Sequence, residues 1–321
     1  MARGMNERIQ KLRELSVTTP VRIDLERARI ETDFYRKNDG KYSIPVMRAM
    51  VLKEYFSKKT LYLGDGELIV GEKGKDPQAS PTFPELCCHS KEDMVVMSER
   101  DLVSFHTTEE DREIQEKEII PYWSGRSMRE KILAAMTPEW NDCYSAGMFT
   151  EFMEQRGPGH TCGGEQNFKV GYLEYKEKIK KTMDALDFMN DPEATDKMEE
   201  LKAMDIACDA VIILGERYHK LALEMAEKEA DPTRKKELEQ IAANLEVVPA
   251  HKPQTFWQAI QLYWFTHLAV TTELNPWDAF SPGRLDQHLI KYYEADTEAG
   301  ILDDERAKEL LECLWVKFYN Q

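Results

Sequence analysis

The stretch that decides the fold is Pro253–Val270, PQTFWQAIQLYWFTHLAV, in which apolar side chains face every side of a helical turn. Aromatic residues fill the consecutive positions Tyr263 to Phe265, and other apolar residues lie one turn away on each face. A helix that is apolar all round is buried on all sides. Pro253 suits the first turn, where its missing N–H would have no helical partner. The sequence therefore predicts a fully buried helix here.

Three further segments have apolar residues at steps of three and four, which is typical of amphipathic helices. They run from about Tyr172 to Leu186, from about Glu199 to Met225 and from about Asp304 to Phe318. Between the helices lie segments rich in Gly, Pro, Asp, Asn and His, which are the usual carriers of binding residues. The predicted fold class is mainly α with few short strands.

Composition limits the function classes. The chain has 321 residues, 42% of them hydrophobic, and a formal net charge of -16, which repels polyanions, so nucleic acid is excluded as a partner. The longest apolar stretch is too short for a membrane helix, and Met1 to Leu15 has no secretory apolar region. Six irregularly spaced cysteines indicate free thiols and a reducing compartment. We therefore expect a cytoplasmic protein that contacts no membrane.

Two motifs with apparent binding chemistry have simpler explanations. Gly64–Gly74, GDGELIVGEKG, predicts a turn, a short strand and another turn, because its glycine spacing matches no phosphate or dinucleotide loop. Cys87-Cys88-His89 lacks the ligand spacing and the second ligand pair of a zinc site. Buried structural thiols, and no metal, are expected there.

Two loops hold candidate proton-transfer residues. His160 lies in Gly157-Pro-Gly-His160, and an imidazole titrates near neutrality, although a lone histidine is more often structural. Asp278 follows the buried helix between Trp277 and Phe280, where apolar surroundings would disfavour its charge. Alternatively, Asp278 caps a turn or pairs with Arg284.

Taken together, several motifs resemble those of the glycyl radical enzymes, the pyruvate formate-lyase-like superfamily, and most closely its 4-hydroxyproline dehydratase branch. The likeness runs from the Met1-Ala-Arg-Gly start to Gln321. Its motifs are Gly64–Gly74, Pro84–His89 (PELCCH), Met136–Trp140 (MTPEW), Gly147–Thr161, Val248–Pro253 (VPAHKP) and Ser281–Gln287 (SPGRLDQ).

The resemblance implies a ten-stranded α/β barrel wrapped in helices. Residues 1–321 would form the amino-terminal, helical part of this pyruvate formate-lyase-type domain, with the barrel incomplete. The active-cysteine loop and the carboxy-terminal glycine radical domain would be absent. No cofactor would bind this part.

The resemblance also implies partners. A radical S-adenosylmethionine activating enzyme with an iron–sulfur cluster would generate the glycyl radical in the missing carboxy-terminal half, and the complete protein would form a homodimer. The implied reaction eliminates water from trans-4-hydroxy-L-proline to give pyrroline-5-carboxylate. By position in matching motifs, His160 and Asp278 would be catalytic, handling protons near the departing hydroxyl, and Phe152, Trp277 and Phe280 would bind the substrate.

The sequence departs from the family in two essential motifs. No cysteine has Glu two positions later, whereas the family's thiyl cysteine lies in Cys-x-Glu; Cys162-Gly-Gly-Glu165 has the wrong spacing. The Arg-Val-x-Gly-aromatic motif of the radical glycine is also missing, because Val170-Gly-Tyr172 lacks the Arg and the intervening residue. We therefore expect the chain alone to be inactive.

Two alternatives stay open at this point. One is a fragment of another glycyl radical enzyme, either a formate C-acetyltransferase-like carbon–carbon lyase or a diol dehydratase; the Gly159-His160 pair favours the dehydratases over the former. The other is a non-catalytic helical protein that binds a partner through exposed apolar surface.

Overall fold

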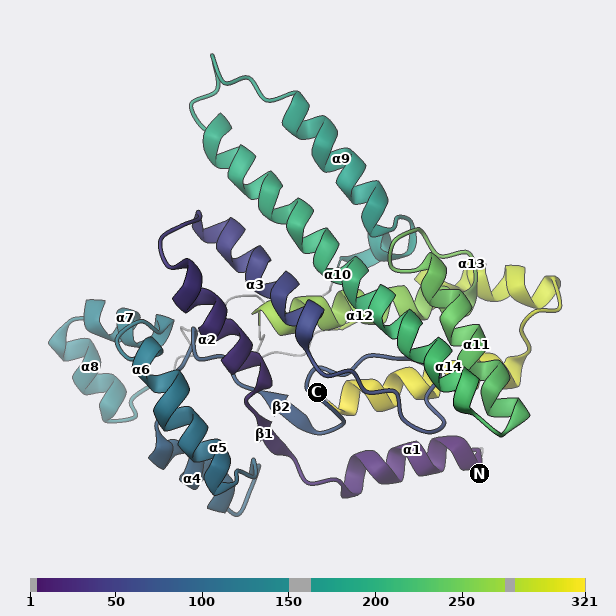
Figure 1. The fold of residues 1–321 in the computed structure, drawn as a ribbon, viewed down its shortest axis with the longest axis horizontal. Coiled ribbons are helices and arrows are strands. Elements are labelled where there is room, and N and C mark those ends of the chain that lie inside the picture. The colour runs from purple at the N-terminus through teal and green to yellow at the C-terminus, as the bar shows by residue number, and fades with distance from the viewer. Residues whose placement is uncertain (1–4, 150–162, 275–280, 321) are drawn as a thin grey trace.

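The computed structural model describes residues 5–149, 163–274 and 281–320. The described part is mainly helical, which confirms the predicted fold class (Figure 1). Its one sheet has two short parallel strands, β1 (Arg22–Asp24) and β2 (Ala79–Pro81), with Ile23 opposite Ser80.

The helices occur in three groups along the chain. Before residue 150 they are α1 (Glu7–Thr18), α2 (Glu26–Asn38), α3 (Ile44–Lys58), α4 (Lys91–Glu99), α5 (Glu109–Ile114), the π-helical turn η1 (Gln115–Ile119), α6 (Ile120–Trp123), α7 (Met128–Ala135) and α8 (Pro138–Ser145). Between the two undescribed stretches they are the 3₁₀ turn η2 (Gly164–Phe168), α9 (Tyr172–Asp184), α10 (Ala194–Lys228), α11 (Pro232–Val247) and α12 (Phe256–Leu274). The last two are α13 (Leu285–Glu298) and α14 (Asp304–Tyr319).

The three amphipathic helices predicted from the sequence are confirmed as α9, α10 and α14. The 35-residue α10 packs along α3, α9 and α11, as Figure 1 shows. The loop after α11 also packs closely on α10, where a Cβ on Gly215 would lie 2.3 Å from Cδ of Pro249. The VPAHKP motif is thus seated directly on α10.

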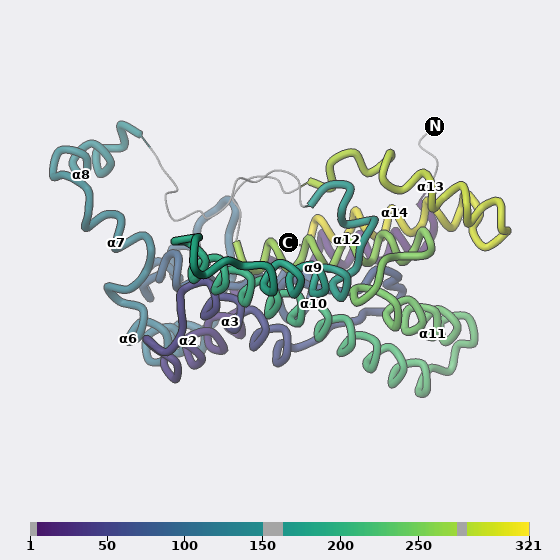
Figure 2. Tube along the Cα trace, turned by 90° about the horizontal axis from the view of Figure 1, so that it is seen from above, coloured from purple at the N-terminus to yellow at the C-terminus, as the bar shows by residue number. Residues whose placement is uncertain are grey.

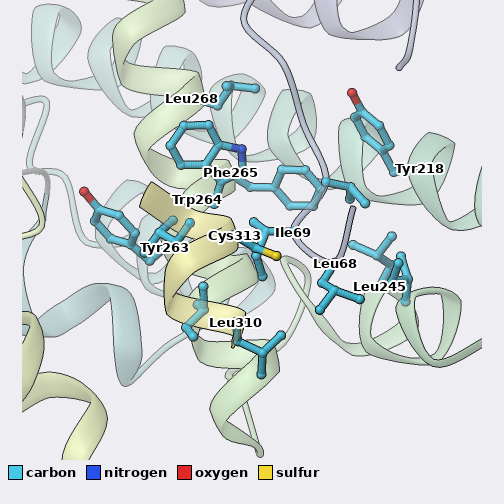
Figure 3. Packing of buried hydrophobic residues seen from close by; sticks show 14 of the residues in the cluster. Leu68, Ile69, Tyr218, Leu245, Tyr263, Trp264, Phe265, Leu268, Leu310 and Cys313 are labelled. Carbon is cyan, nitrogen blue, oxygen red and sulfur yellow. The ribbon is translucent and has the colours of Figure 1, made fainter. Parts of the chain in front are cut away.

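Helix α12 lies at the centre of the main core. Fifteen of its 19 residues are buried, which confirms the prediction of a helix buried all round. Figure 3 shows its Tyr263, Trp264 and Phe265 packed with Leu310 of α14 and with Leu68. The expectation that Pro253 lies in the first turn was wrong, because the helix begins at Phe256. The carbonyl of Thr255 accepts the first helical hydrogen bond, and Asp296 accepts one from the Phe256 N–H at 2.8 Å.

The strand predicted within Gly64–Gly74 is absent from the structure, although Leu68, Ile69 and Val70 are fully buried. Side chains of α12 take the place of a neighbouring strand. The Gln261 amide accepts from the Val70 N–H and donates to the Val70 carbonyl, both at 2.9 Å, and Trp257 donates to the Leu68 carbonyl. The buried backbone is therefore satisfied without a sheet.

The cysteines differ partly from expectation. Cys87 and Cys88 are half-buried rather than buried, while Cys208 and Cys313 are buried, and none of the four is in a disulfide. Burial raises the pKa of the Cys88 thiol to about 12. Cys88 therefore stays protonated and unreactive at neutral pH.

Helices α7 and α8 project from the rest of the molecule (Figure 2). Every residue of both helices is at least partly exposed. The rings of Trp140 and Tyr144 stack, and Phe149 meets both at a steep angle, with centroids 5.0 to 5.9 Å apart. This small cluster is what holds the end of α8, just before residue 150.

Candidate functional site

All five site residues predicted from the sequence lie outside the described residues. Phe152 and His160 fall within residues 150–162, and Trp277, Asp278 and Phe280 within residues 275–280. Their proposed roles therefore stay predictions. The structure does describe the elements from which both stretches start and to which they return.

Three elements that border the two stretches are packed together. Turn η2 follows the first stretch, α12 precedes the second and α13 follows it. The ring of Phe168, in η2, stacks on Tyr263 of α12 at 6.0 Å and on His288 of α13 at 5.2 Å. The Tyr292 hydroxyl of α13 also donates to the Phe168 carbonyl. These contacts of Phe168 hold η2, which follows the first stretch, beside α12 and α13, which precede and follow the second stretch.

The chain leaves the first stretch through a turn that requires glycine. Gly163 has a φ of 64°, in the left-handed region. A Cβ at this position would also lie 2.4 Å from Oδ1 of the buried Asn167. Any other residue would therefore strain the backbone and displace Asn167.

An ion pair holds the other border, the carboxyl end of α12. Glu273, in the last turn of α12, pairs with Arg48 of α3, and the two side chains are 22% and 30% exposed. This pair joins α3 to the last described turn of α12.

A fully buried ion network lies next to this pair. The Arg27 guanidinium of α2 contacts Glu31 at 2.6 Å and Glu85 at 2.8 Å, and all three side chains are at most 4% exposed. It also donates to the Thr82 carbonyl at 3.2 Å. We call Arg27, Glu31, Arg48, Glu85 and Glu273 the α12-end cluster.

Within the α12-end cluster, the pKa values of Glu31 and Arg27 are both shifted. Burial raises the pKa of Glu31 well above its usual value, Arg27 opposes this, and Glu85, which is hydrogen-bonded to Glu31, raises it further. For Arg27, burial favours the neutral form, but Glu31 and Glu85 raise its pKa above its usual value. Burial thus disfavours the charged form of Glu31, while Arg27 is held charged between the two carboxyls.

A second buried network fixes the Gly64–Gly74 segment. Lys317 of α14 pairs with Glu67 and, at 2.6 Å, with Glu72; all three side chains are at most 5% exposed. Burial alone would lower the pKa of Lys317, but the two carboxylates raise it above its usual value. Lys59 donates to the carbonyls of residues 72, 73 and 74, and burial lowers its pKa to about 8.

Sequence reasoning missed both networks. Arg27 and Glu31 have the i,i+4 spacing of an ordinary solvated helix face, and nothing local marks them as buried. Glu85 of the first network and Glu67 and Glu72 of the second lie in motifs that carry the resemblance, but nothing in those motifs shows that they form buried ion pairs. Within the described residues, no group of His, Cys, Asp or Glu side chains could hold a metal ion, and no helix is long and apolar enough to span a membrane.

Comparison with known proteins places this arrangement in a family. The family described as pyruvate formate lyase-like matches residues 5–321. This chain belongs to that family. The family match and the relatives below confirm the resemblance stated from the motifs.

Two curated relatives differ widely in their similarity to this pyruvate formate lyase-like chain. It is 56% identical over all its 321 residues to the trans-4-hydroxy-L-proline dehydratase of Clostridioides difficile, and covers 41% of that protein. It is 32% identical to the isethionate sulfite-lyase of Desulfovibrio desulfuricans, with 98% of the chain and 39% of the relative covered. The chain thus spans about two fifths of the length of these relatives, as expected for part of a larger member.

Solved structures agree with this family fold. A crystal structure of the Clostridioides difficile hydroxyproline dehydratase with trans-4-hydroxy-L-proline bound matches with a TM-score of 0.96, covering 100% of this chain and 41% of that one. A Roseburia inulinivorans structure concerned with 1,2-propanediol dehydration matches with a TM-score of 0.92 at 29% identity, covering 99% and 38%.

Proposed function

We propose that this chain is part of a glycyl radical dehydratase that removes water from trans-4-hydroxy-L-proline and releases pyrroline-5-carboxylate. The observation that carries the proposal is the 56% identity along the entire chain to a protein of that name, against 32% to a sulfite-lyase. The fold alone would not decide, because a structure concerned with 1,2-propanediol dehydration matches almost as well.

The proposed catalytic residues are His160 and Asp278, which handle protons and orient the substrate near the departing hydroxyl. Phe152, Trp277 and Phe280 line the substrate pocket. The packing of η2 against α12 and α13 supports this grouping, because the stretches that carry these residues are bordered by elements in contact with one another.

The complete protein supplies the remaining machinery. A glycyl radical oxidises a cysteine to a thiyl radical, which abstracts the substrate hydrogen and later returns it, and these 321 residues contain the motif of neither the glycine nor the cysteine. The proposed partners are an activating enzyme with S-adenosylmethionine and an iron–sulfur cluster, and a second copy of the complete protein. The proposed compartment is the cytoplasm.

The test uses the complete protein, activated without oxygen, and measures pyrroline-5-carboxylate formed from trans-4-hydroxy-L-proline. His160→Ala and Asp278→Ala should each lower turnover about 100-fold or more, because proton transfer by a positioned side chain contributes about 10² to 10⁴. The glycyl radical signal in electron paramagnetic resonance should be retained.

His251→Ala and Asp286→Ala are the matched controls, because their side chains are 57% and 74% exposed and lie outside the two stretches. Both should keep wild-type turnover. Unchanged turnover in His160→Ala and Asp278→Ala would refute the assigned roles, and an activated wild type that forms no pyrroline-5-carboxylate would refute the proposed function.

A further inference from the structure

A hollow of about 330 Å³ lies between the end of α2, the start of α3, and helices α6 and α7. Helix α6 packs against α2 at this place (Figure 1). Six of the ten residues that line the hollow are apolar or aromatic, and three are charged. Ligand pockets in proteins have volumes of about 300 to 1,000 Å³ and the same make-up, a mainly apolar and aromatic wall with a few polar groups. The hollow therefore has the size and the lining of a small-molecule site.

The buried wall of the hollow is held in place by its own contacts. Trp123 and Met47 are the buried members of the lining, at 5% and 6% exposed. The indole N–H of Trp123 donates to Oγ1 of Thr32 at 2.8 Å, so the polar atom of this ring is satisfied. The rings of Tyr35 and Tyr122 meet Trp123 steeply, with centroids 5.2 and 5.0 Å away. The hollow thus offers a fixed aromatic surface, on which another ring can pack.

Two large side chains of the lining have little cover. Ile44, the first residue of α3, is 79% exposed, and Tyr42 is 44% exposed. Scattered exposed apolar residues are ordinary, but these two lie together at a concave aromatic surface. A ligand in the hollow would remove their apolar area from water, which favours binding.

The charged side chains of the lining carry one positive charge in excess. Arg126 pairs with Asp39 at 2.7 Å, and its guanidinium lies 4.6 Å from the ring centroid of Tyr122. Arg has five N–H donors, so this pair leaves donors for a second carboxylate. Lys131 of α7 completes the set and has no ion-pair partner among the described residues. In a chain of formal net charge -16, this local excess favours an anion.

We propose that this hollow binds a small organic monoanion in which a short chain joins an aromatic ring to a carboxylate. The ring packs on Trp123 and Met47, and the carboxylate accepts from Arg126 and Lys131. An inorganic anion would leave the aromatic wall uncovered, and an organic cation would be repelled by Lys131. The site is separate from the proposed dehydration, because none of the residues of the hollow is assigned a role in that reaction.

Isothermal titration calorimetry of the 321-residue chain with 3-phenylpropionate tests the site. We expect saturable binding of one ligand per chain with a Kd of about 1 mM or tighter, which is within the usual range for so small a ligand. Two analogues separate the contributions: 3-phenylpropanamide lacks the charge, and butyrate lacks the ring. Each should bind about 5-fold more weakly or worse, because an exposed ion pair and an aromatic contact contribute about that much each.

Three substitutions should shift the affinity in opposite directions. Lys131→Met and Tyr122→Leu should each weaken binding of 3-phenylpropionate about 3- to 5-fold, by loss of a cation and of an aromatic contact. Asp39→Asn removes the carboxylate that competes for Arg126, so it should tighten binding about 2- to 5-fold. A side chain with only a structural role would not give this reversal of sign.

Lys117→Met is the matched control. Lys117 lies on the neighbouring turn η1, is 66% exposed and does not line the hollow. Its loss changes the net charge of the chain as Lys131→Met does. The control should therefore keep the wild-type Kd.

Four results would overturn the proposal: no saturable binding of 3-phenylpropionate by the wild type, equal affinity for 3-phenylpropanamide, equal weakening in Lys117→Met and Lys131→Met, or weaker binding in Asp39→Asn. If Tyr122→Leu does not fold, the exposed positions 131 and 39 decide. The complete protein should bind 3-phenylpropionate with the same affinity as the chain. Loss of binding there would show that the rest of the protein fills the hollow, and would also overturn the site.

Discussion

Replacing Glu31 by Gln tests whether the most buried carboxyl of the α12-end cluster carries a proton in the folded protein. Its side chain is 3% exposed and shares the Arg27 guanidinium with Glu85. Gln has the same size and is neutral, like a protonated Glu. We expect Glu31→Gln not to lower the free energy of unfolding at pH 7 and to raise it by up to about 3 kcal/mol, because taking up a proton on folding costs the wild type about 1.4 kcal/mol for each pH unit above the usual pKa of 4.5.

Glu85→Gln should behave differently, although it is the same chemical change on the opposite side of Arg27. It removes the carboxylate that balances a guanidinium only 4% exposed. Breaking a buried ion pair on one side costs about 3 to 5 kcal/mol. Glu31 can ionise in compensation, but only against its raised pKa, so we expect a loss of about 3 kcal/mol.

The pH dependence of the stability difference between wild type and Glu31→Gln tests the same prediction independently. Because the folded-state pKa of Glu31 is raised above its usual value of 4.5, its contribution to stability is fully present below that value. The contribution is lost as the pH rises through the folded-state pKa. The stability difference, wild type minus Glu31→Gln, should therefore decrease from about pH 5 to about pH 8.

Urea unfolding of the chain, followed by circular dichroism at both pH values, measures these differences as shifts of the midpoint at constant slope. Equal losses in Glu31→Gln and Glu85→Gln at pH 7 would refute the reasoning. So would a stability difference between wild type and Glu31→Gln that does not change with pH, since Glu31 would then be ionised throughout.

Three more predictions concern the core and the projecting helices. Lys317→Met should lower the free energy of unfolding by about 3 kcal/mol or more in urea titrations, because it leaves two buried carboxylates without their cation, whereas Lys197→Met, with a side chain 47% exposed, should cost less than about 1 kcal/mol. Gln261→Leu should cost about 2 to 4 kcal/mol in the same assay, because the buried N–H and carbonyl of Val70 lose their partners, while Gln10→Leu, which removes an exposed hydrogen bond, should be nearly neutral. In hydrogen exchange of the chain alone, amides of α7 and α8 should exchange much faster than those of α12, since eight-residue helices without buried residues are marginal; equal protection would contradict this.

The sequence could predict the helices because their signal is local. The all-round apolar pattern of α12 and the stripes of α9, α10 and α14 each lie within one segment. The start of α12 was misplaced because Pro253 was placed in the first turn, whereas Thr255 caps the helix by accepting from the Gln258 N–H at 3.3 Å and Asp296, 40 residues away, accepts from the Phe256 N–H. Local pattern fixes the existence of a helix better than its ends.

The Gly64–Gly74 segment shows why the rest could not be predicted. Three consecutive buried apolar residues have the local signature of a strand, yet their backbone partner is Gln261, 191 residues from Val70. The α12-end cluster could not be predicted from the sequence either. Arg27, Glu85 and Glu273 are far apart in the chain, and each has the local pattern of a surface charge. His160 and Asp278 were identified through their motifs and not through geometry.

The most direct test of the central claim is the specificity of the complete, activated protein, measured as kcat/KM for trans-4-hydroxy-L-proline, isethionate and 1,2-propanediol. We predict turnover of trans-4-hydroxy-L-proline to pyrroline-5-carboxylate, with kcat/KM at least about 10⁴-fold above that for either other compound, since a site built for one set of polar groups rejects compounds lacking them by about that factor. Turnover of isethionate or 1,2-propanediol at a comparable or higher kcat/KM would contradict the account.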